Sequence, residues 1–387
     1  MISRDQLNTA RGLFPYTASG RIYLNHAGTG PLSTRVVAAV QRHLRERSDG
    51  TLDTYPADIE LARRLRGSLA KLIHAEGHAR IAFQSSTSDA LNIVAGGLRW
   101  KSVDRILLND LEFPANVYPY LNLKKHGVEL DVIPSRDGMV TVEMIERWLG
   151  PRTKLLALSA VQFLSGHRAD LAAIGSLCRR RGIIFAVDGI QAVGAMKIDV
   201  QAMSIDAFAA GAQKWQLAPH GTGFLYVSED LQSRIQQQYL GWLAVEDPWN
   251  FRNYDQPLAH SARRYEGGSL NLPGLHGYEA AVSTLLEFGP DAIENHILDL
   301  TAVLREGLQA LPGVKVITPP RREDHAGIIS IQLPSTTNDK RFFVNMQENG
   351  VTPALREGKV RYSPHFYNTV EEMERTVEIT RQSLGNS

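Results

Sequence analysis

"FAAGAQKWQLAPHGTGFLYV", residues 208–227, joins two apolar runs through a turn that is rich in glycine and proline. The runs cover 207–211 and 223–227, and both are typical of strands that are buried on two faces. Lys214 closely follows the first run. Ligands of parallel sheets bind at the carboxyl ends of the strands, so Lys214 has the position of a functional residue. A loop lysine is ordinarily a solvated surface charge, and a functional role therefore requires partners elsewhere in the chain.

The chain up to about residue 270 alternates short apolar runs with helical patterns. Further strands are predicted at 80–84, 105–109, 129–134, 154–161 and 183–188. Helices are predicted at 34–47 after the cap Ser33, at 57–73, and at 170–181 with Asp170 at its start. This alternation predicts an α/β fold with a mostly parallel central sheet and helices on both faces.

The pattern changes after about residue 270. Two helices are predicted at 271–289 and 291–311, and three strands within 314–319, 327–334 and 359–366. A last helix is predicted at 369–384, with Thr369 as its cap. We therefore expect a large domain over 16–270 and a smaller C-terminal α+β domain over 271–387, with residues 1–15 packing near the smaller one.

Composition limits the classes of partner. The 387 residues contain 42 Lys+Arg and 41 Asp+Glu, and a net charge of +1 gives no reason to expect nucleic acid or an anionic membrane. Residues 1–16 lack the apolar core of a signal peptide, and no apolar run reaches membrane-spanning length. Cys178 is the single cysteine, which excludes a disulfide framework and a cysteine metal cluster. No zinc-hydrolase motif occurs, so we expect a cytoplasmic protein without a metal.

Two polar residues stand at the end of the strand predicted at 183–188. A carboxylate such as Asp188 is costly there unless a cation or a donor meets it, and one such partner is a cationic ring nitrogen. Gln191 can face the same pocket. The alternatives are a turn aspartate and a solvated glutamine at a helix start.

Hydroxyl and aromatic side chains follow two other strands. Ser85, Ser86, Thr87 and Ser88 open a helix, where free N–H groups and the helix dipole attract an anion such as a phosphate. The alternative for this cluster is a simple helix cap. Phe113 follows the strand at 105–109 and either packs in the core or stacks on a flat ring.

Arg361 lies in "KVRYSPHFYNT", residues 359–369, on a predicted strand of the smaller domain. It is either a solvated surface charge or a bidentate clamp for a substrate carboxylate.

The combination of a strand-ending Asp-x-x-Gln, a later lysine and a Gly-rich turn resembles the class V aminotransferase group of fold-type I pyridoxal-phosphate enzymes. That group includes cysteine desulfurases, isopenicillin N epimerase-like proteins, kynureninases and C–S lyases. The resemblance extends from "YLNHAGTGPLS" at 23–33 to "RYSPHFYNT" at 361–369, nearly the whole chain.

The resemblance implies pyridoxal 5′-phosphate as cofactor and assigns roles to the candidates. Lys214 would form the internal aldimine and move the α-proton, and Asp188 would pair with the ring nitrogen so that the ring withdraws electrons. Gln191 would bind the ring hydroxyl, and Phe113 would stack on the ring. The implied phosphate ligands are Ser86, Thr87, Ser88 and Gln213, with Ser269 from the neighbouring subunit of a homodimer.

The implied substrate is an amino acid whose carboxylate is clamped by Arg361, with help from the backbone at Ala27 and Gly28. Side chains that can line the other end of the substrate are His26, Arg356, Tyr55 and His365. Each of these four is otherwise an ordinary surface or core residue.

Three departures from the group affect the predicted reaction. The loop before Arg361 has no cysteine, and Cys178 lies in a helical pattern, which disfavours persulfide chemistry. Phe163 stands where many relatives have Asn, so that contact is missing or comes from Gln162. Phe113 stands where desulfurases have His, and with Arg356 it resembles the epimerase-like and kynureninase-like branches.

We therefore predict an aminotransferase-like enzyme that acts on an α-amino acid. A C–S or β-lyase, or an epimerase, acting on a β-substituted or peptide-like amino acid is the alternative. A non-catalytic dimeric relative is disfavoured because Lys214, Asp188 and Arg361 are all present.

Overall fold

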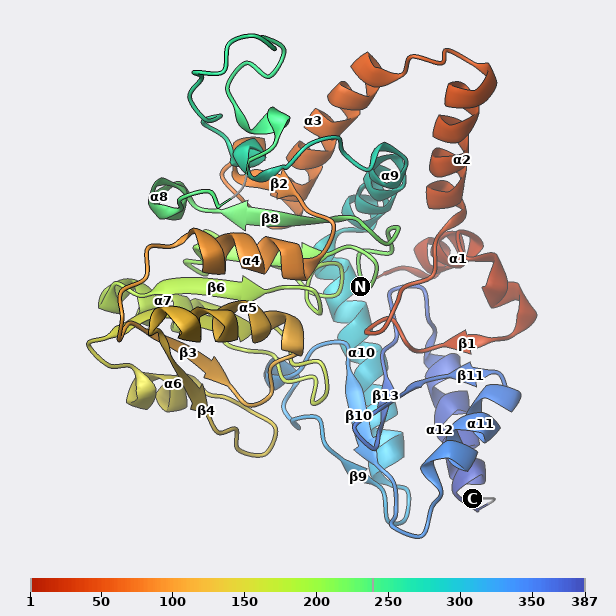
Figure 1. The fold of residues 1–387 in the computed structure, drawn as a ribbon. Coiled ribbons are helices and arrows are strands. Elements are labelled where there is room, and N and C mark those ends of the chain that lie inside the picture. The colour runs from red at the N-terminus through yellow and green to blue at the C-terminus, as the bar shows by residue number, and fades with distance from the viewer. Residues whose placement is uncertain (1, 239, 386–387) are drawn as a thin grey trace.

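The computed structural model describes residues 2–238 and 240–385, and its largest sheet has seven strands (Figure 1). In spatial order the strands are β2 (Ile81–Phe83), β8 (Gly223–Val227), β7 (Ala207–Gly211), β6 (Ile184–Asp188), β5 (Thr153–Ser159), β3 (Arg105–Asn109) and β4 (Glu129–Ile133). β8 is antiparallel to both of its neighbours, and the other pairs are parallel. The seven strands are those predicted from the apolar runs, so the mostly parallel sheet is confirmed.

Helices cover both faces of this sheet (Figure 1). They are α3 (Tyr55–Leu72), α4 (Thr87–Gly97), α5 (Tyr118–Leu121), α6 (Val142–Trp148), α7 (Leu171–Arg181), α8 (Glu229–Arg234) and α9 (Leu272–Phe288). α2 (Thr34–Asp49) stands away from the strands and packs against α9. Side chains of β6 alternate between the faces: Phe185 and Val187 pack in one hydrophobic cluster with α3, α7 and α9, and Ile184 and Ala186 in another with α4 and α8. This alternation confirms the predicted helices on both faces.

The predicted helix caps are present. Oγ of Ser33 accepts the N–H of Val36, and the side chain of Asp170 accepts the N–H of Ala173. α7 ends at Gly182, whose φ of 67° is a left-handed conformation that glycine adopts without strain. Short 3₁₀ helices connect other elements, namely η1 (Pro15–Ser19), η2 (His78–Arg80), η3 (Pro114–Asn116), η4 (Asn122–His126), η5 (Trp242–Ala244), η6 (Ala262–Tyr265) and η7 (Arg322–Asp324).

The C-terminal part is a smaller α+β unit. Its elements are α10 (Pro290–Gln309), β9 (Lys315–Val316), β10 (Ile329–Gln332), α11 (Asp339–Glu348), β11 (Val351–Thr352), β12 (Ala354–Arg356), β13 (Lys359–Tyr362) and α12 (Val370–Gly385). An antiparallel sheet in the order β12-β13-β10-β9 packs against α10 and α12 in a third hydrophobic cluster. β1 (Ile22–Tyr23) pairs with β11, and neither strand was predicted, nor were α11 and β12.

The boundary between the predicted domains crosses shared structure. α9, which the sequence places at the start of the second domain, packs with α2 and α3 in the core of the large sheet. α1 (Arg4–Gly12) contacts the C-terminal part, because Arg11 binds Glu372 and the carbonyl of Tyr367. The division at residue 270 stays a prediction.

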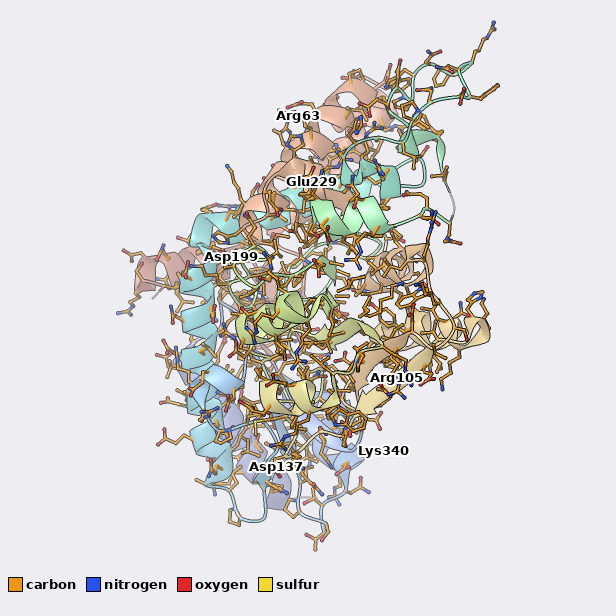
Figure 2. All side chains as sticks on the ribbon, turned by 90° about the vertical axis from the view of Figure 1, so that its left-hand side faces the viewer. Arg63, Arg105, Asp137, Asp199, Glu229 and Lys340 are labelled. Carbon is orange, nitrogen blue, oxygen red and sulfur yellow. The ribbon has the colours of Figure 1, made fainter. Side chains whose placement is uncertain are left out.

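Figure 2 shows charged side chains such as Arg63 on α3 and Lys340 on α11 projecting outward at opposite ends of the molecule.

Candidate active site

The carboxyl ends of four neighbouring strands bring the candidate residues together. Asp188 is the last residue of β6, and it is paired in register with Ser159, the last residue of β5, and with Ala209 of β7. Lys214 follows β7 after a short turn, and Glu112 follows β3. Ligands of parallel sheets gather at this edge, and the predicted position of Lys214 agrees with it.

The loop that holds Lys214 is packed against the N-terminal segment. The N–H of Gly30 donates to the carbonyl of Gln213 at 2.8 Å. A Cβ on Gly30 would lie 2.3 Å from the carbonyl oxygen of Lys214, so only glycine fits this approach. The segment around Gly30 therefore fixes the backbone from which the lysine side chain extends.

Lys214 and Asp188 share one buried environment. Burial lowers the pKa of Lys214, the charge of Asp188 opposes this effect, and Arg361 and Arg356 lower it further. Burial raises the pKa of Asp188, while the N–H of Ile190, 2.9 Å from Oδ1, and the charge of Lys214 lower it. The site thus holds an amine that is easily made neutral, next to a carboxylate with few partners.

Phe113 is not a core residue, because 43% of it is exposed. Nζ of Lys214 lies 5.6 Å from the centre of the Phe113 ring. The ring of Phe163 contacts Phe113 edge-on, with 5.3 Å between the ring centres. An exposed aromatic face next to the lysine is the arrangement that stacking on a flat ligand requires.

The hydroxyl cluster at the start of α4 divides into two parts. Ser86 is the cap, since its Oγ accepts the N–H of Asp89 at 3.1 Å, and both Ser85 and Ser86 donate to the Asp89 carboxylate. Thr87 is buried and its Oγ1 accepts the N–H of Gly211 at 2.8 Å, which ties α4 to the end of β7. Within the described residues the hydroxyls of Thr87 and Ser88 donate no hydrogen bond, whereas that of Ser86 donates to Asp89, so Thr87 and Ser88 fit an anion better than Ser86 does.

Gln213 and Gln191 border the same region. Oε1 of Gln213 would lie 2.7 Å from a Cβ built on Gly211, which places the amide over the end of β7. Oε1 of Gln191 accepts the indole N–H of Trp215 at 2.7 Å, and Nε2 donates to the carbonyl of Ala27 at 3.0 Å. The second amide hydrogen of Gln191 remains for a ligand.

Arg361 is the buried cation of the site. The side chain is on β13, the residue is 2% exposed, and Nη1 donates to the carbonyl of Phe163 at 2.6 Å. Nε is buried without a partner, and no ion pair of Arg361 is present within the described residues. A buried guanidinium without a carboxylate is costly, and the carboxylate of a ligand supplies the missing partner.

Several other predicted substrate contacts are placed differently. His26 is fully buried, and both of its ring nitrogens are bonded, Nδ1 to the carbonyl of Ser363 and Nε2 to the hydroxyl of Tyr367. Within this structure no ring nitrogen of His26 is left for a substrate. The N–H groups of Ala27 and Gly28 donate to Ser363 and Asn25. The ring nitrogens of His26 and the N–H groups of Ala27 and Gly28 are therefore bonded within the protein.

The remaining candidates also lie outside the buried cluster, although the charge of the exposed Arg356 still acts on Lys214 and Arg361. His365 is buried, with Nε2 bonded to the carbonyl of Trp215. Tyr55 contacts Trp249, Arg356 is exposed at the end of β12, and Ser269 is exposed before α9.

Glu112 is a site residue that the sequence analysis missed. Its buried carboxylate accepts hydrogen bonds from Asn109, Asn116, Gln162 and both the N–H and the hydroxyl of Ser159, at 2.6–3.0 Å. The signal was the Glu directly before Phe113 in "LEFPAN". Glu112 connects the ends of β3 and β5, and its charge raises the pKa of Asp188.

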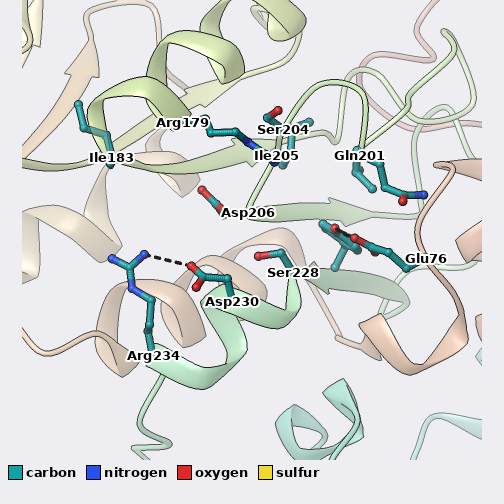
Figure 3. Close-up of a pocket in the computed structure, with 13 residues that line it drawn as sticks. Glu76, Arg179, Ile183, Gln201, Ser204, Ile205, Asp206, Ser228, Asp230 and Arg234 are labelled. Atoms are coloured by element: carbon teal, nitrogen blue, oxygen red, sulfur yellow. Dashed lines mark hydrogen bonds and ion pairs between the residues drawn. The ribbon is translucent and has the colours of Figure 1, made fainter.

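A separate cavity of about 510 Å³ lies at the opposite ends of the strands from Lys214 (Figure 3). Asp206 and Ser228 line it, together with the ion pair of Asp230 and Arg234. Asp206 precedes β7 and Ser228 follows the antiparallel β8, so the cavity borders the amino ends of the parallel strands. It is not part of the cluster around Lys214.

The residues at the carboxyl edge fit pyridoxal phosphate. An easily neutralised amine suits the aldehyde, a buried carboxylate suits the ring nitrogen, and the hydroxyls at the start of α4 suit the phosphate. The exposed face of Phe113 offers a surface for the ring. The unpartnered Nε of Arg361 marks the place of a further anion.

Among the described residues, no helix has the length and apolar character of a membrane span.

Known proteins resemble the chain over most of its length. The family model "Aminotransferase class-V" matches residues 22–376. A probable cysteine desulfurase of Methanothermobacter thermautotrophicus is 28% identical and covers 94% of this chain and 95% of its own. Isopenicillin N epimerase of Streptomyces clavuligerus is 29% identical, with 92% and 93% covered.

Solved structures confirm the fold. A mutant of C-DES with glycine covalently linked to the pyridoxal-phosphate cofactor superposes with a TM-score of 0.88 at 23% identity, covering 96% of this chain and 98% of that one. The cysteine desulfurase CsdA of Escherichia coli gives 0.87 at 20% identity, with 98% of each chain covered. The family match and the cluster around Lys214 agree: the chain belongs to the class V aminotransferase family of pyridoxal-phosphate enzymes.

Proposed function

We propose that this enzyme acts on an α-amino acid in an aminotransferase-like reaction, with Lys214 as the attachment point of the cofactor and as the base. The observation that supports this proposal most is Arg361, a buried guanidinium with an unpartnered Nε next to the Lys214 cluster. A substrate α-carboxylate is the anion that this guanidinium lacks.

The residues of the chain perform distinct tasks. Bound pyridoxal phosphate supplies an electron-withdrawing ring that makes the α-hydrogen of an amino acid acidic. Arg361 binds and orients the carboxylate, and Phe113 covers one side of the site. The Lys214 amine, whose pKa burial lowers, takes the α-proton in its neutral form. Asp188, held by the N–H of Ile190, would pair with the ring nitrogen of the bound cofactor.

The test is a panel of amino acids. Purified enzyme with cofactor is mixed with each amino acid, with and without an added 2-keto acid, and the products are identified. Transamination requires the keto acid and converts it to a new amino acid. Protein that binds no cofactor and shows no spectral change with any amino acid contradicts the proposal.

A lyase or epimerase is the second candidate, and the isopenicillin N epimerase at 29% identity favours it. A lyase releases a keto acid and ammonia without any added keto acid. An epimerase changes only the configuration of the α-carbon, which chiral chromatography measures. Lys214 and Arg361 serve all of these reactions, so the product decides among them.

Persulfide-forming desulfuration is not proposed, although relatives carry that name. Cys178 is the single cysteine and is 1% exposed within α7. Burial raises the pKa of its thiol to about 12, so almost no thiolate is present near neutral pH.

We also propose a cytoplasmic homodimer in which Ser269 reaches the phosphate in the partner subunit. Ser269 is exposed, and the nearby loop presents Trp249, Phe251 and Tyr254, which are 54%, 64% and 94% exposed. Such an aromatic surface is typical of an interface. Light scattering measures the mass of the assembly, and cell fractionation tests the compartment.

Mixed dimers test the shared site. A dimer of one Lys214→Ala chain and one Ser269→Ala chain has one intact site only if Ser269 acts across the interface. Activity of this mixed dimer near half of the wild-type value supports the proposal. Activity no higher than that of the Ser269→Ala dimer contradicts it.

A further inference from the structure

A second cluster of titratable side chains lies between three helices and shares no residue with the cluster around Lys214. His43 comes from α2, Asp58 from α3 and His276 from α9. Oδ1 of Asp58 lies 2.8 Å from Nε2 of His276 and 3.5 Å from Nδ1 of His43. The two imidazole rings stack with 4.3 Å between their centres. Two ring nitrogens and one carboxylate oxygen thus converge on one point.

The carboxylate is held in place for this arrangement. Asp58 is 1% exposed, and its Oδ2 accepts a hydrogen bond of 2.8 Å from the hydroxyl of Thr54. Oδ1 then faces the two histidines. Within the described residues Asp58 forms no ion pair with Lys or Arg. A buried carboxylate without a permanent cation favours binding of one.

His43 lacks the partners that a buried imidazole normally has. It is 3% exposed, and its Nε2 is buried without a hydrogen bond among the described residues. Its Nδ1 is 3.5 Å from Asp58, at the limit of a hydrogen bond. Buried polar atoms are nearly always bonded. Since Nε2 has no partner and Nδ1 has only this long contact, no short hydrogen bond competes with a cation for Nδ1.

A cavity of about 600 Å³ connects the cluster with the surface. Its lining includes His43, Asp58 and His276, and the acidic Glu46, Asp53 and Glu279. Arginines line it as well, and two of them are paired, Arg35 with Glu287 and Arg64 with Glu60. The cavity gives a cation a path of entry and leaves room for water as a further ligand.

We propose that His43 Nδ1, Asp58 Oδ1 and His276 Nε2 bind a divalent first-row cation of the Zn²⁺ type. Two imidazoles and one carboxylate are ligands that Zn²⁺, Co²⁺ and Fe²⁺ accept, whereas Ca²⁺ and Mg²⁺ prefer oxygen ligands. The three ligand atoms lie within 4.8 Å of one another. Tetrahedral zinc separates its ligand atoms by roughly 3.4 Å, so small side-chain rotations complete the site. Bound metal links α2, α3 and α9.

The experiment uses tag-free enzyme with its cofactor, stripped with EDTA and then titrated with ZnCl₂ or CoCl₂. Metal analysis after buffer exchange is expected to give one Zn²⁺ per chain. Co²⁺ is expected to produce visible d–d bands at longer wavelength than the cofactor absorbs. Zn²⁺ is expected to raise the melting temperature of the wild type.

His276→Asn is the main variant, because His276 is partly exposed and its replacement leaves the buried pair in place. It is expected to weaken Zn²⁺ binding at least tenfold and to abolish the rise in melting temperature. Asp58→Asn is the second variant. Exposed His126→Asn is the matched control, and Lys214→Ala, which removes the cofactor-binding amine, is expected to keep its zinc. Absence of stoichiometric metal in the wild type, or equal binding by wild type and His276→Asn, overturns the proposal.

Discussion

Nη1 of Arg361 donates a 2.6 Å hydrogen bond to the carbonyl oxygen of Phe163, and this contact links β13 of the C-terminal sheet with the loop after β5 of the large sheet. Burial, together with the charge of the nearby Arg356, lowers the pKa of Arg361 to about 10. The guanidinium is therefore fixed in position by a neutral acceptor while its charge stays unbalanced. A substrate carboxylate both pairs with this charge and is oriented by it.

Replacing Arg361 by alanine is expected to weaken amino-acid binding by roughly 2–3 kcal/mol, or roughly 30- to 150-fold, because a buried charge-assisted pair is lost. Cofactor affinity is expected to stay unchanged. Titrations of the spectral shift by amino acid and of fluorescence by cofactor measure the two affinities. Arg361→Lys keeps the charge and should recover part of the binding. Exposed Arg341→Ala is the control, and equal loss of both affinities by Arg361→Ala would falsify the assigned role.

The Lys214 amine is expected to react at a lower pH than an ordinary surface lysine, because burial lowers its pKa. Acylation of cofactor-free enzyme, followed at Lys214 by peptide mass spectrometry, measures the pH at which the amine becomes neutral. The positive charge of Arg361 favours the neutral amine, so Arg361→Ala should raise this pH. The negative charge of Asp188 favours the protonated amine, so Asp188→Asn should lower it.

Surface Lys125 serves as the reference within the same digest. Shifts of the same sign in both variants, or a Lys214 profile identical to that of Lys125, contradict the electrostatic description of the site.

The central sheet was predictable because its strands are continuous apolar runs, which occur only where both faces are covered. β5, β6, β7 and β8 have this pattern, and so the position of Asp188 and Lys214 at the ends of β6 and β7 followed from it. β1, β11 and β12 have only two or three residues each. Strands of this length carry no period of their own, since pairing with a distant segment defines them. β2 and β9 are as short, but each lies inside a longer segment with the composition of a strand, 80–84 and 314–319, and was predicted from that segment.

The roles of individual polar residues were less predictable, because a hydrogen-bonding partner far along the chain decides each one. His26 looked like a substrate contact, but Ser363 and Tyr367 occupy both of its ring nitrogens. Ser86 looked like its neighbours in a hydroxyl cluster, but the N–H of Asp89 makes it a cap. Ser33 and Asp170 were predictable because a cap bonds to a residue three positions away.

Glu112→Gln is expected to destabilise the protein by about 2–4 kcal/mol, because a carboxamide retains one acceptor oxygen and turns its own N–H groups toward donors. The carboxylate accepts hydrogen bonds from Asn109, Asn116, Ser159 and Gln162. Urea unfolding of the cofactor-free protein measures the change. Glu374→Gln, at an exposed position on α12, is the matched control and should be neutral. Equal unfolding midpoints for the two variants contradict the network.

Cys178→Ala is expected to keep full turnover, because the buried thiol takes no part in the reaction. Burial raises its pKa to about 12, with Asp206 as a second cause, so the thiolate fraction at pH 8 is roughly 10⁻⁴. The substitution removes only a small buried group and should cost about 1 kcal/mol of stability. In the native wild type a thiol reagent should modify Cys178 only after guanidinium unfolding. A folded Cys178→Ala variant that has lost turnover, or a persulfide on Cys178 detected by mass spectrometry, would place this enzyme with the desulfurases after all.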